Sequence, residues 1–408
     1  MELNCHYNQQ ARLKEFARME GKHYKLTMVD IKRRKIGSRN VEKAFYQKGL
    51  YSEEVERELN SKIEMPGMRV FSKVYNSKGA VILTRDELET MKKYLLVQLY
   101  RNPTNMATYS PNWAGDILGF NKEFKNDAEA NKHVCDEIHT ICNSTWKELS
   151  LTKDRELLNN IVLITQTMTL FVKSDVLEFV INDIGSVTER RPYFGHKRED
   201  FRNMFKVMGI GEIPDDKIDE LIRTHQYYDN FTFYPISSYF GIVLLTPIWT
   251  NLIKEKQPFR YVESLIPDYP FDVEVDFDFF DWAERKAGVH SEFIRQHFVP
   301  CINIYESEKL QDLRSKTVEE AMKLIVENSS PNDKYFYPVA QLNLNWSEYL
   351  NRLTINEARD YFAFGSISDG KISVGNYEME RLMYCKPGEA KLDLSWIDFN
   401  SDWTQPLN

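Results

Sequence analysis

The chain has 408 residues, of which 42% are hydrophobic and 13% aromatic, so it is long enough to bury one large core or two ordinary ones. Its formal net charge of −8 excludes a protein coated in basic surface, so contact with nucleic acid would require local basic patches. The five cysteines are scattered and odd in number, which excludes a disulfide framework and indicates a reducing compartment. No leader pattern opens the chain and no apolar run reaches the roughly 18 residues of a membrane span, so we expect a cytoplasmic protein without a membrane partner.

A strand and a basic hairpin are the first elements that the sequence predicts. Residues 22–36, KHYKLTMVDIKRRKI, read as a strand that enters a hairpin near residues 22–45. Gly37 and Ser38 are the residue types expected at its turn.

Helices are predicted next. Ser52 can cap a helix over residues 53–64, and Pro66 is expected to interrupt that helix because it lacks a backbone N–H. Thr84, followed three residues later by a glutamate, forms a capping box for a helix over residues 85–101.

The stretch HVCDEIHTIC, residues 133–142, raises the question of a metal site. Its apolar positions recur at spacings of three and four, which predicts an amphipathic helix. Cys135 and Cys142 would then lie about 10 Å apart along the helix axis, too far to share one zinc ion. We therefore expect both cysteines to pack in or beside the core. Pairing of either one with His139, completed by ligands from elsewhere, is the open alternative.

Further along, the apolar pattern alternates between helix and strand periods. Residues 151–172 are predicted to form a central helix, and residues 176–183 and 239–246 to form strands, the second inside a sheet. Residues 272–280, DVEVDFDFF, alternate strictly, so four carboxylates would line one strand face. That face is predicted to be solvated, with a site for a hard cation as the alternative.

These elements predict an α+β fold that is predominantly helical with a small mixed β-sheet. No linker composition divides the chain, so residues 1–370 are predicted to form a single domain. Residues 371–408 are predicted to form an irregular C-terminal tail or peripheral strands.

Two basic segments, 32–43 and 189–202, stand out from the acidic background. The second mixes arginines and lysine with aromatic residues, a mixture that suits phosphate contact and base stacking. A solvated hairpin tip and loop would have the same composition. The candidate nucleic-acid-binding residues are Arg33, Arg34, Lys35, Arg39, Arg190, Arg191, Lys197 and Arg198.

Several motifs, taken in order, resemble one known family. They are NCHYNQQARLKEFA, KGLYSEEVERELNSKIE, LTRDELETMKKYLLVQLYRNP, EFVINDIGSV, FYPISSYFGIVLL and YLNRLTINEARDYFAFGS. From about His6 to about Ser366 the chain resembles the bacterial domain-of-unknown-function family numbered forty-two thirty-eight. Asn8 and Gln9 depart from its opening motif, and only Asp183 remains of its strand motif. The family name carries no reaction.

The resemblance implies a set of matched polar residues, namely His6, Glu64, Arg101, Asp183 and Asn351. If they converge, they would suit phosphodiester cleavage. His6 would act as general acid or base. Glu64 and Asp183 would hold Mg or Mn or orient water, and Arg101 would stabilise the phosphoryl charge. This hypothesis is a metal-dependent, nuclease-like hydrolase acting on nucleic acid as a toxin or antiviral defence effector.

Structural roles explain the same residues equally well. Glu64 and Arg101 would form an interhelical ion pair, and Asp183 and Asn351 would bind backbone groups at a strand end and a helix. The competing class is a non-enzymatic sensor or adaptor that binds a protein partner, or a second copy, through aromatic surface in residues 227–234. An enzyme should gather the polar set around one cleft, whereas an adaptor should expose an apolar patch.

Overall fold

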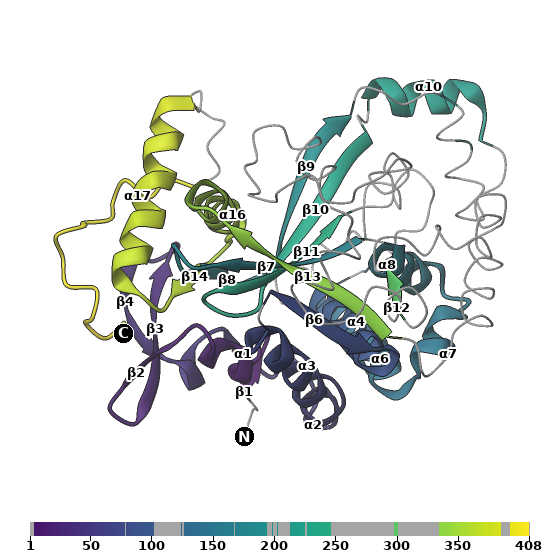
Figure 1. Ribbon diagram of the computed structural model, residues 1–408, viewed down its shortest axis with the longest axis horizontal. Helices are drawn as coiled ribbons and strands as arrows, with labels where there is room; N and C mark the ends of the chain where they lie inside the picture. Colours follow the sequence, from purple (N-terminus) through teal and green to yellow (C-terminus); the bar gives the residue numbers. More distant parts are fainter. Residues whose placement is uncertain are drawn as a thin grey trace.

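Two large β-sheets lie side by side and helices pack around them, as the computed structural model shows (Figure 1). The structure describes residues 4–101 except 78, 124, 126–193 except 167, 198, 202, 213–245 except 225–226, 298–300, 334–384 and 392–407. A single large core cluster runs through most elements, and a smaller one lies under the C-terminal residues.

The larger sheet has seven strands in the order β12-β13-β7-β11-β10-β9, with β6 paired to β13. Its strands are β6 (Ala80–Thr84), β7 (Met168–Ser174), β9 (Val187–Tyr193), β10 (Tyr227–Pro235), β11 (Phe240–Leu245), β12 (Phe298–Pro300) and β13 (Lys334–Leu342). β11 lies between β7 and β10, and its apolar residues on both faces explain this interior place. The interior strand predicted at residues 239–246 is thereby confirmed.

The smaller sheet has five strands in the order β2-β3-β14-β8, with β4 on the other side of β3. Its strands are β2 (Arg18–Glu20), β3 (His23–Asp30), β4 (Lys35–Asn40), β8 (Ile181–Asn182) and β14 (Tyr361–Phe364). β1 (Asn4–His6) pairs separately with β5 (Tyr46–Lys48). The turn between β3 and β4 is formed by residues 31–34, where Arg34 has a positive φ, so the turn predicted at Gly37 and Ser38 is wrong.

Helices pack on both sheets. α3 and α4 contact β6, and α6 and α8 contact α4, whereas α16 contacts β8 and β9, and α17 contacts α16 and β14. The helices are α1 (Gln10–Lys14), η1 (Val41–Lys43), α2 (Glu53–Glu58), η2 (Leu59–Glu64), α3 (Met65–Tyr75), α4 (Arg85–Tyr100), α6 (Asp127–Asn143), α7 (Trp146–Ser150), α8 (Arg155–Gln166), α10 (Asp215–Thr224), α16 (Leu344–Glu357) and α17 (Ile367–Tyr384). The cap predicted at Ser52 and the capping box predicted at Thr84 are both confirmed: Ser52 accepts from the N–H of Val55, and Thr84 and Glu87 form the full box.

The predicted fold class is wrong in its proportions. In the described part of the chain, sheets of seven, five and two strands make the protein a mixed α+β fold, not a helical one with a small sheet. One cause is the run predicted as a helix over residues 151–172, of which α8 takes the first part and β7 the last. Its apolar residues satisfy either period, since both α8 and β7 are buried on more than one side.

Helical structure continues through Pro66 instead of stopping there. α2, the π-helix η2 and α3 follow one another without a break. In a regular α-helix Pro66 could not donate to the carbonyl of Lys62 and its ring would crowd that group. The wider π-helical turn directly before it removes this conflict. Glu64, the last residue of η2, contacts the end of α4 as a result of this path.

The C-terminal residues are part of the fold. The predicted domain boundary at residue 370 falls inside α17. Beyond that helix, Trp403 is buried in the smaller core cluster and the main chain of Ser38 in β4 bonds Gln405 and Leu407. Residues 392–407 therefore cover the outer edge of β4 beside the C-terminus (Figure 1).

Candidate functional site

Three of the five matched polar residues meet at the N-terminal strand. Arg101, which follows α4, forms an ion pair with Glu64 of η2 through Nη1. Its Nη2 donates to the main-chain carbonyl of His6 in β1. Arg101 is only 2% exposed. Burial alone would lower its pKa, but the charge of Glu64 and its neighbours raises it, so the guanidinium stays charged.

The imidazole of His6 is buried and engaged at both nitrogens. Nδ1 lies 3.1 Å from the carbonyl oxygen of Ala44, and Nε2 lies 2.7 Å from Nε2 of Gln10. Burial lowers the pKa of His6 to about 4, and the charge of Arg101 acts in the same direction. The ring is therefore neutral at neutral pH, with Nδ1 as donor to Ala44 and Nε2 as acceptor from Gln10.

Glu56 joins this group, although sequence reasoning did not single it out. Its carboxylate accepts the backbone N–H of His6, and burial raises its pKa, while the charge of Arg101 opposes that rise. The peptide of His6 is thus held on its N–H side by Glu56 and on its carbonyl side by Arg101. In the sequence Glu56 looks like one more surface glutamate in EEVERE, because nothing local marks it as half-buried.

Asp183 lies apart from this group, and its carboxylate binds main-chain N–H groups. Its two carboxylate oxygens accept three backbone N–H groups, from Arg359 at 3.1 Å, Asp360 at 2.6 Å and Tyr361 at 3.2 Å. Burial raises its pKa, and these three hydrogen bonds oppose the rise. This carboxylate therefore organises the turn that leads from α16 into β14.

Asn351 of α16 holds the chain just before β8. Its Oδ1 accepts from the N–H of Val180 at 2.9 Å, and its Nδ2 donates to the carbonyl of Glu178 at 2.7 Å and to Ser373 Oγ at 3.0 Å. It is fully buried. All its polar atoms are engaged, so Asn351 ties α16 to the β8 segment and to α17.

A second buried arginine, in α1, binds main-chain carbonyl groups. Arg12 donates through Nε to the carbonyl of Pro235 at 2.9 Å and through Nη2 to that of Gly185 at 2.6 Å. Among the described residues no carboxylate pairs with it, and burial lowers its pKa. Gly185, at φ +76°, leaves no room for a side chain here, because an added Cβ would lie 2.5 Å from Asn8 Oδ1. Asn8 in turn donates to the carbonyl of Asn182 at 2.8 Å.

The N-terminal segment thus connects two polar groups that do not merge into one site. His6, Glu64 and Arg101 lie together, whereas Asp183 and Asn351 bind main chain at β8 and α16. The two predicted metal ligands have other partners: Glu64 forms an ion pair with Arg101, and Asp183 accepts three backbone N–H groups. Within the part of the chain that the structure describes, no three His, Cys, Asp or Glu side chains are arranged to hold a metal ion.

The basic hairpin tip carries acidic neighbours. Lys32 forms an ion pair with Asp360 at 2.7 Å, and Arg33 lies 3.9 Å from Asp30. Hydrogen bonds with Ser395 lower the pKa of Asp393, and the charges of Arg381 and Arg34 add to this lowering. Arg39 Nη2 donates to the carbonyl of Leu407 at 3.4 Å, and Lys35 is exposed. Much of the charge predicted to meet phosphate is therefore balanced within the fold.

The second basic segment lies at a sheet edge and beyond it. Arg190 and Arg191 are in β9, opposite Asn230 and Asp229 of β10. Arg198 pairs with Asp219 and Asp215 of α10. Lys197 lies outside the described residues, as do residues 272–280 with their four carboxylates.

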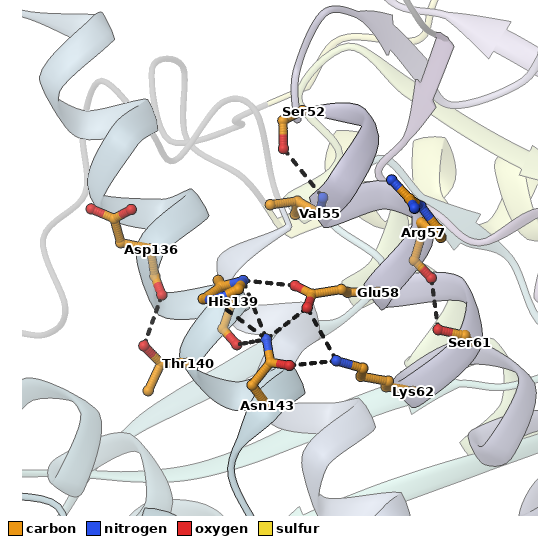
Figure 2. Close-up of polar contacts among 10 residues, drawn as sticks. All are labelled: Ser52, Val55, Arg57, Glu58, Ser61, Lys62, Asp136, His139, Thr140 and Asn143. Atoms are coloured by element: carbon orange, nitrogen blue, oxygen red, sulfur yellow. Dashed lines mark hydrogen bonds and ion pairs between the residues drawn. The ribbon is translucent and has the colours of Figure 1, made fainter.

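The helix predicted at residues 133–142 is α6, in which the exposed His139 lies one turn from both Cys135 and Cys142. Cys142 is buried and Cys135 half-buried, and burial raises their pKa values to about 12 and about 11. Figure 2 shows His139 turned toward Glu58 of α2, beside Asn143 and Lys62, and its Nδ1 lies 2.7 Å from Glu58 Oε2. These contacts fasten α6 to α2 and η2.

The outer face of α17 exposes a row of large apolar side chains. Ile372, Met379, Leu382 and Met383 are 47%, 58%, 72% and 67% exposed. Their spacing places them on one face, while Val374 and Tyr377 on the opposite face enter the smaller core cluster. α17 stands at the outside of the molecule (Figure 1). We call these four residues the α17 row. By contrast Phe233 and Tyr234, from the aromatic run expected to bind a partner, are buried in the core.

Comparison with known proteins gives one match. A family model described as "Protein of unknown function (DUF4238)" matches residues 4–368, which confirms the resemblance drawn from the motifs. No curated protein and no solved structure matches the chain. Of the described helices, none is long and apolar enough to cross a membrane. Because the family model covers most of the sequence, the chain belongs to the DUF4238 family of proteins of unknown function.

Proposed function

We propose that this protein is a non-enzymatic adaptor or sensor that binds a protein partner through the α17 row. The observation that carries the proposal is the exposure of four large apolar side chains on one helix face. Scattered apolar residues are ordinary on a protein surface, but a contiguous apolar patch marks an interaction site. α17 begins at Ile367 and the family match ends at residue 368, so nearly all of this helix lies beyond the matched residues.

Burial of the polar set favours a structural role for it. His6, Arg101, Asp183 and Asn351 are each at most 5% exposed, and their polar groups bind main chain or one another. A nuclease must bring a polymer backbone within hydrogen-bond reach of its catalytic groups. Side chains with this exposure do not offer such reach.

The raised pKa of Glu56 favours the alternative, a nuclease-like hydrolase acting as a toxin or defence effector. A carboxyl group with a raised pKa beside a buried arginine is typical of catalytic sites, although structural ion-pair networks also produce it. Its test is incubation of the purified chain with DNA and RNA in magnesium, manganese or EDTA. Cleavage lost in folded Glu56→Gln and His6→Gln variants would support the hydrolase.

Photo-crosslinking tests the adaptor proposal. A photoreactive amino acid is placed at Met383 in one variant and at Met65 in a control variant. Met65 is exposed on α3, far from α17 in the sequence. We expect a discrete protein adduct from position 383 in the native cells and none from position 65. Adducts of the same pattern from both positions, or from neither, would contradict the proposal.

A further inference from the structure

The α17 row has the length and spacing of a helix-binding seam. Ile372 and Met383 are 11 residues apart, about 16 Å along the helix axis. Ile372, Met379 and Met383 follow one another at spacings of seven and four. Apolar residues at these spacings form the contact seam when two helices pack lengthwise. A partner must run along α17 to contact all of them.

Small residues on the same face leave room for a partner's side chains. Ser368 and Gly375 lie seven residues apart, and Leu382 continues their line. A Cβ added at Gly375 would lie 3.9 Å from the ring of Phe399, an ordinary van der Waals contact, so the surface beside Phe399 is shallow but not blocked. Holes between large side chains accept knobs from a facing helix. Met379 and Met383 are flexible and polarizable, so they adapt to the shape of such knobs.

One edge of the row is acidic. Asp369, Asn376 and Glu380 lie along the edge of α17 that faces α16, as the bond from Asn376 to Glu348 at 2.6 Å and the ion pair of Glu380 with Arg352 show. Glu348 and Asp369 form no ion pair among the described residues. With Arg352 balancing Glu380, this edge keeps two negative charges.

We infer from these observations that the α17 row binds an amphipathic helix of a protein partner whose polar flank is basic. The inference rests on the proposed function and names the partner's chemistry. Lysine or arginine beside the partner's apolar seam would lie against Glu348 and Asp369, and the net charge of −8 would attract such a helix. A second copy of this chain would instead bring two acidic edges together, and an anionic lipid surface would be repelled.

Two synthetic helices test the inference directly. Both carry leucine at heptad positions a and d; one has lysine and the other glutamate at positions e and g. Each is labelled and titrated with the intact chain while fluorescence anisotropy is measured. We expect the lysine peptide to bind and the glutamate peptide to bind at least tenfold more weakly. Leu382→Glu and Met379→Glu should each weaken the lysine peptide about tenfold or more, Glu348→Gln should weaken it roughly two- to fivefold, and Met65→Glu should leave it unchanged.

Other occupants give different results. Equal binding of both peptides would contradict the inference that the partner helix has a basic flank, but it would not contradict the proposed adaptor function. Loss of a dimer in the Leu382→Glu variant during analytical ultracentrifugation would identify a second copy as the occupant. Binding to phosphatidylcholine or phosphatidylserine vesicles that Leu382→Glu abolishes would identify lipid, and would overturn the adaptor function as well. Failure of both peptides to bind overturns the inference, whereas crosslinking at Met383 judges the adaptor function separately.

Discussion

Arg101 donates to the main-chain carbonyl of His6 and not to its imidazole. The arginine therefore positions the N-terminal strand, and it does so together with Glu56, which accepts the N–H of the same residue. A polar cluster that resembles a catalytic set by residue type is in this respect a clamp on a peptide unit. Substitutions of its members should therefore change the stability of the fold, as the following predictions state.

Removing Arg101 should cost stability. In Arg101→Met the carboxylate of Glu64 stays partly buried without its cation, and breaking a buried ion pair in this way costs about 3–5 kcal/mol. Urea unfolding of the variant measures the loss. Arg57→Met, at an exposed position of the adjacent α2, is the control and should change stability little. A loss below about 1 kcal/mol for Arg101→Met would show that the clamp is unimportant.

Stability should fall in mild acid because of His6. Its pKa is about 4 in the folded chain and near 6.5 when unfolded, so the unfolded chain binds more protons between these values. The contribution is fully present above pH 6.5 and is lost as pH falls to about 4, by about 3 kcal/mol. Unfolding free energies across this range should show a slope that His6→Gln reduces. An unchanged slope in that variant would assign the acid sensitivity to other groups.

Glu56→Gln should stabilise the chain at neutral pH. Because burial raises the pKa of Glu56, its carboxylate form disfavours folding above the ordinary glutamate pKa. A glutamine keeps an oxygen acceptor for the N–H of His6 and removes the charge. The advantage over the native chain should disappear as pH falls below that pKa, and Glu54→Gln at an exposed position should show no such trend. A destabilised Glu56→Gln at pH 7 would mean that the charge of Arg101 outweighs burial.

Asp183→Asn should destabilise the fold by about 1–3 kcal/mol, because the amide group of asparagine cannot accept all three backbone N–H groups that the carboxylate binds. Thermal or urea unfolding measures this change. Asp175→Asn, at an exposed residue that forms a surface ion pair with Lys173, serves as the matched control. Unaltered stability of Asp183→Asn would remove the structural explanation of this residue.

Local signals in the sequence predicted several elements and missed what depends on long-range packing. Ser52 and Thr84 mark helix starts because their bonds reach only three residues ahead. The sequence predicts a helix where β7 lies, since an apolar run that is buried on all sides has no distinguishing period. Thr354 and Glu357 also have the spacing of a capping box, which predicts a helix start, but both lie in the last turn of α16, where Thr354 Oγ1 donates to the carbonyl of Leu350.

The candidate site was predictable to a smaller extent. The motifs led to His6, Glu64 and Arg101, which do lie together. Glu56 and Arg12 were missed because their burial follows from tertiary contacts, with Arg12 bonding Pro235 more than two hundred residues away. The sequence does not predict the α17 row, because residues 371–408 are expected to form an irregular tail or peripheral strands. Only the fold shows that a helix runs through Tyr384 and which of its sides packs inward.

Oxidative footprinting of methionines tests the central claim most directly. Met19, Met65, Met379 and Met383 are all about half exposed or more, so the purified chain should oxidise at all four. In native cells, a partner helix seated on α17 should protect Met379 and Met383 while Met19 and Met65 still react. Mass spectrometry reads each site in the same sample. Equal oxidation of all four methionines in cells would contradict the claim that the α17 row is a binding surface.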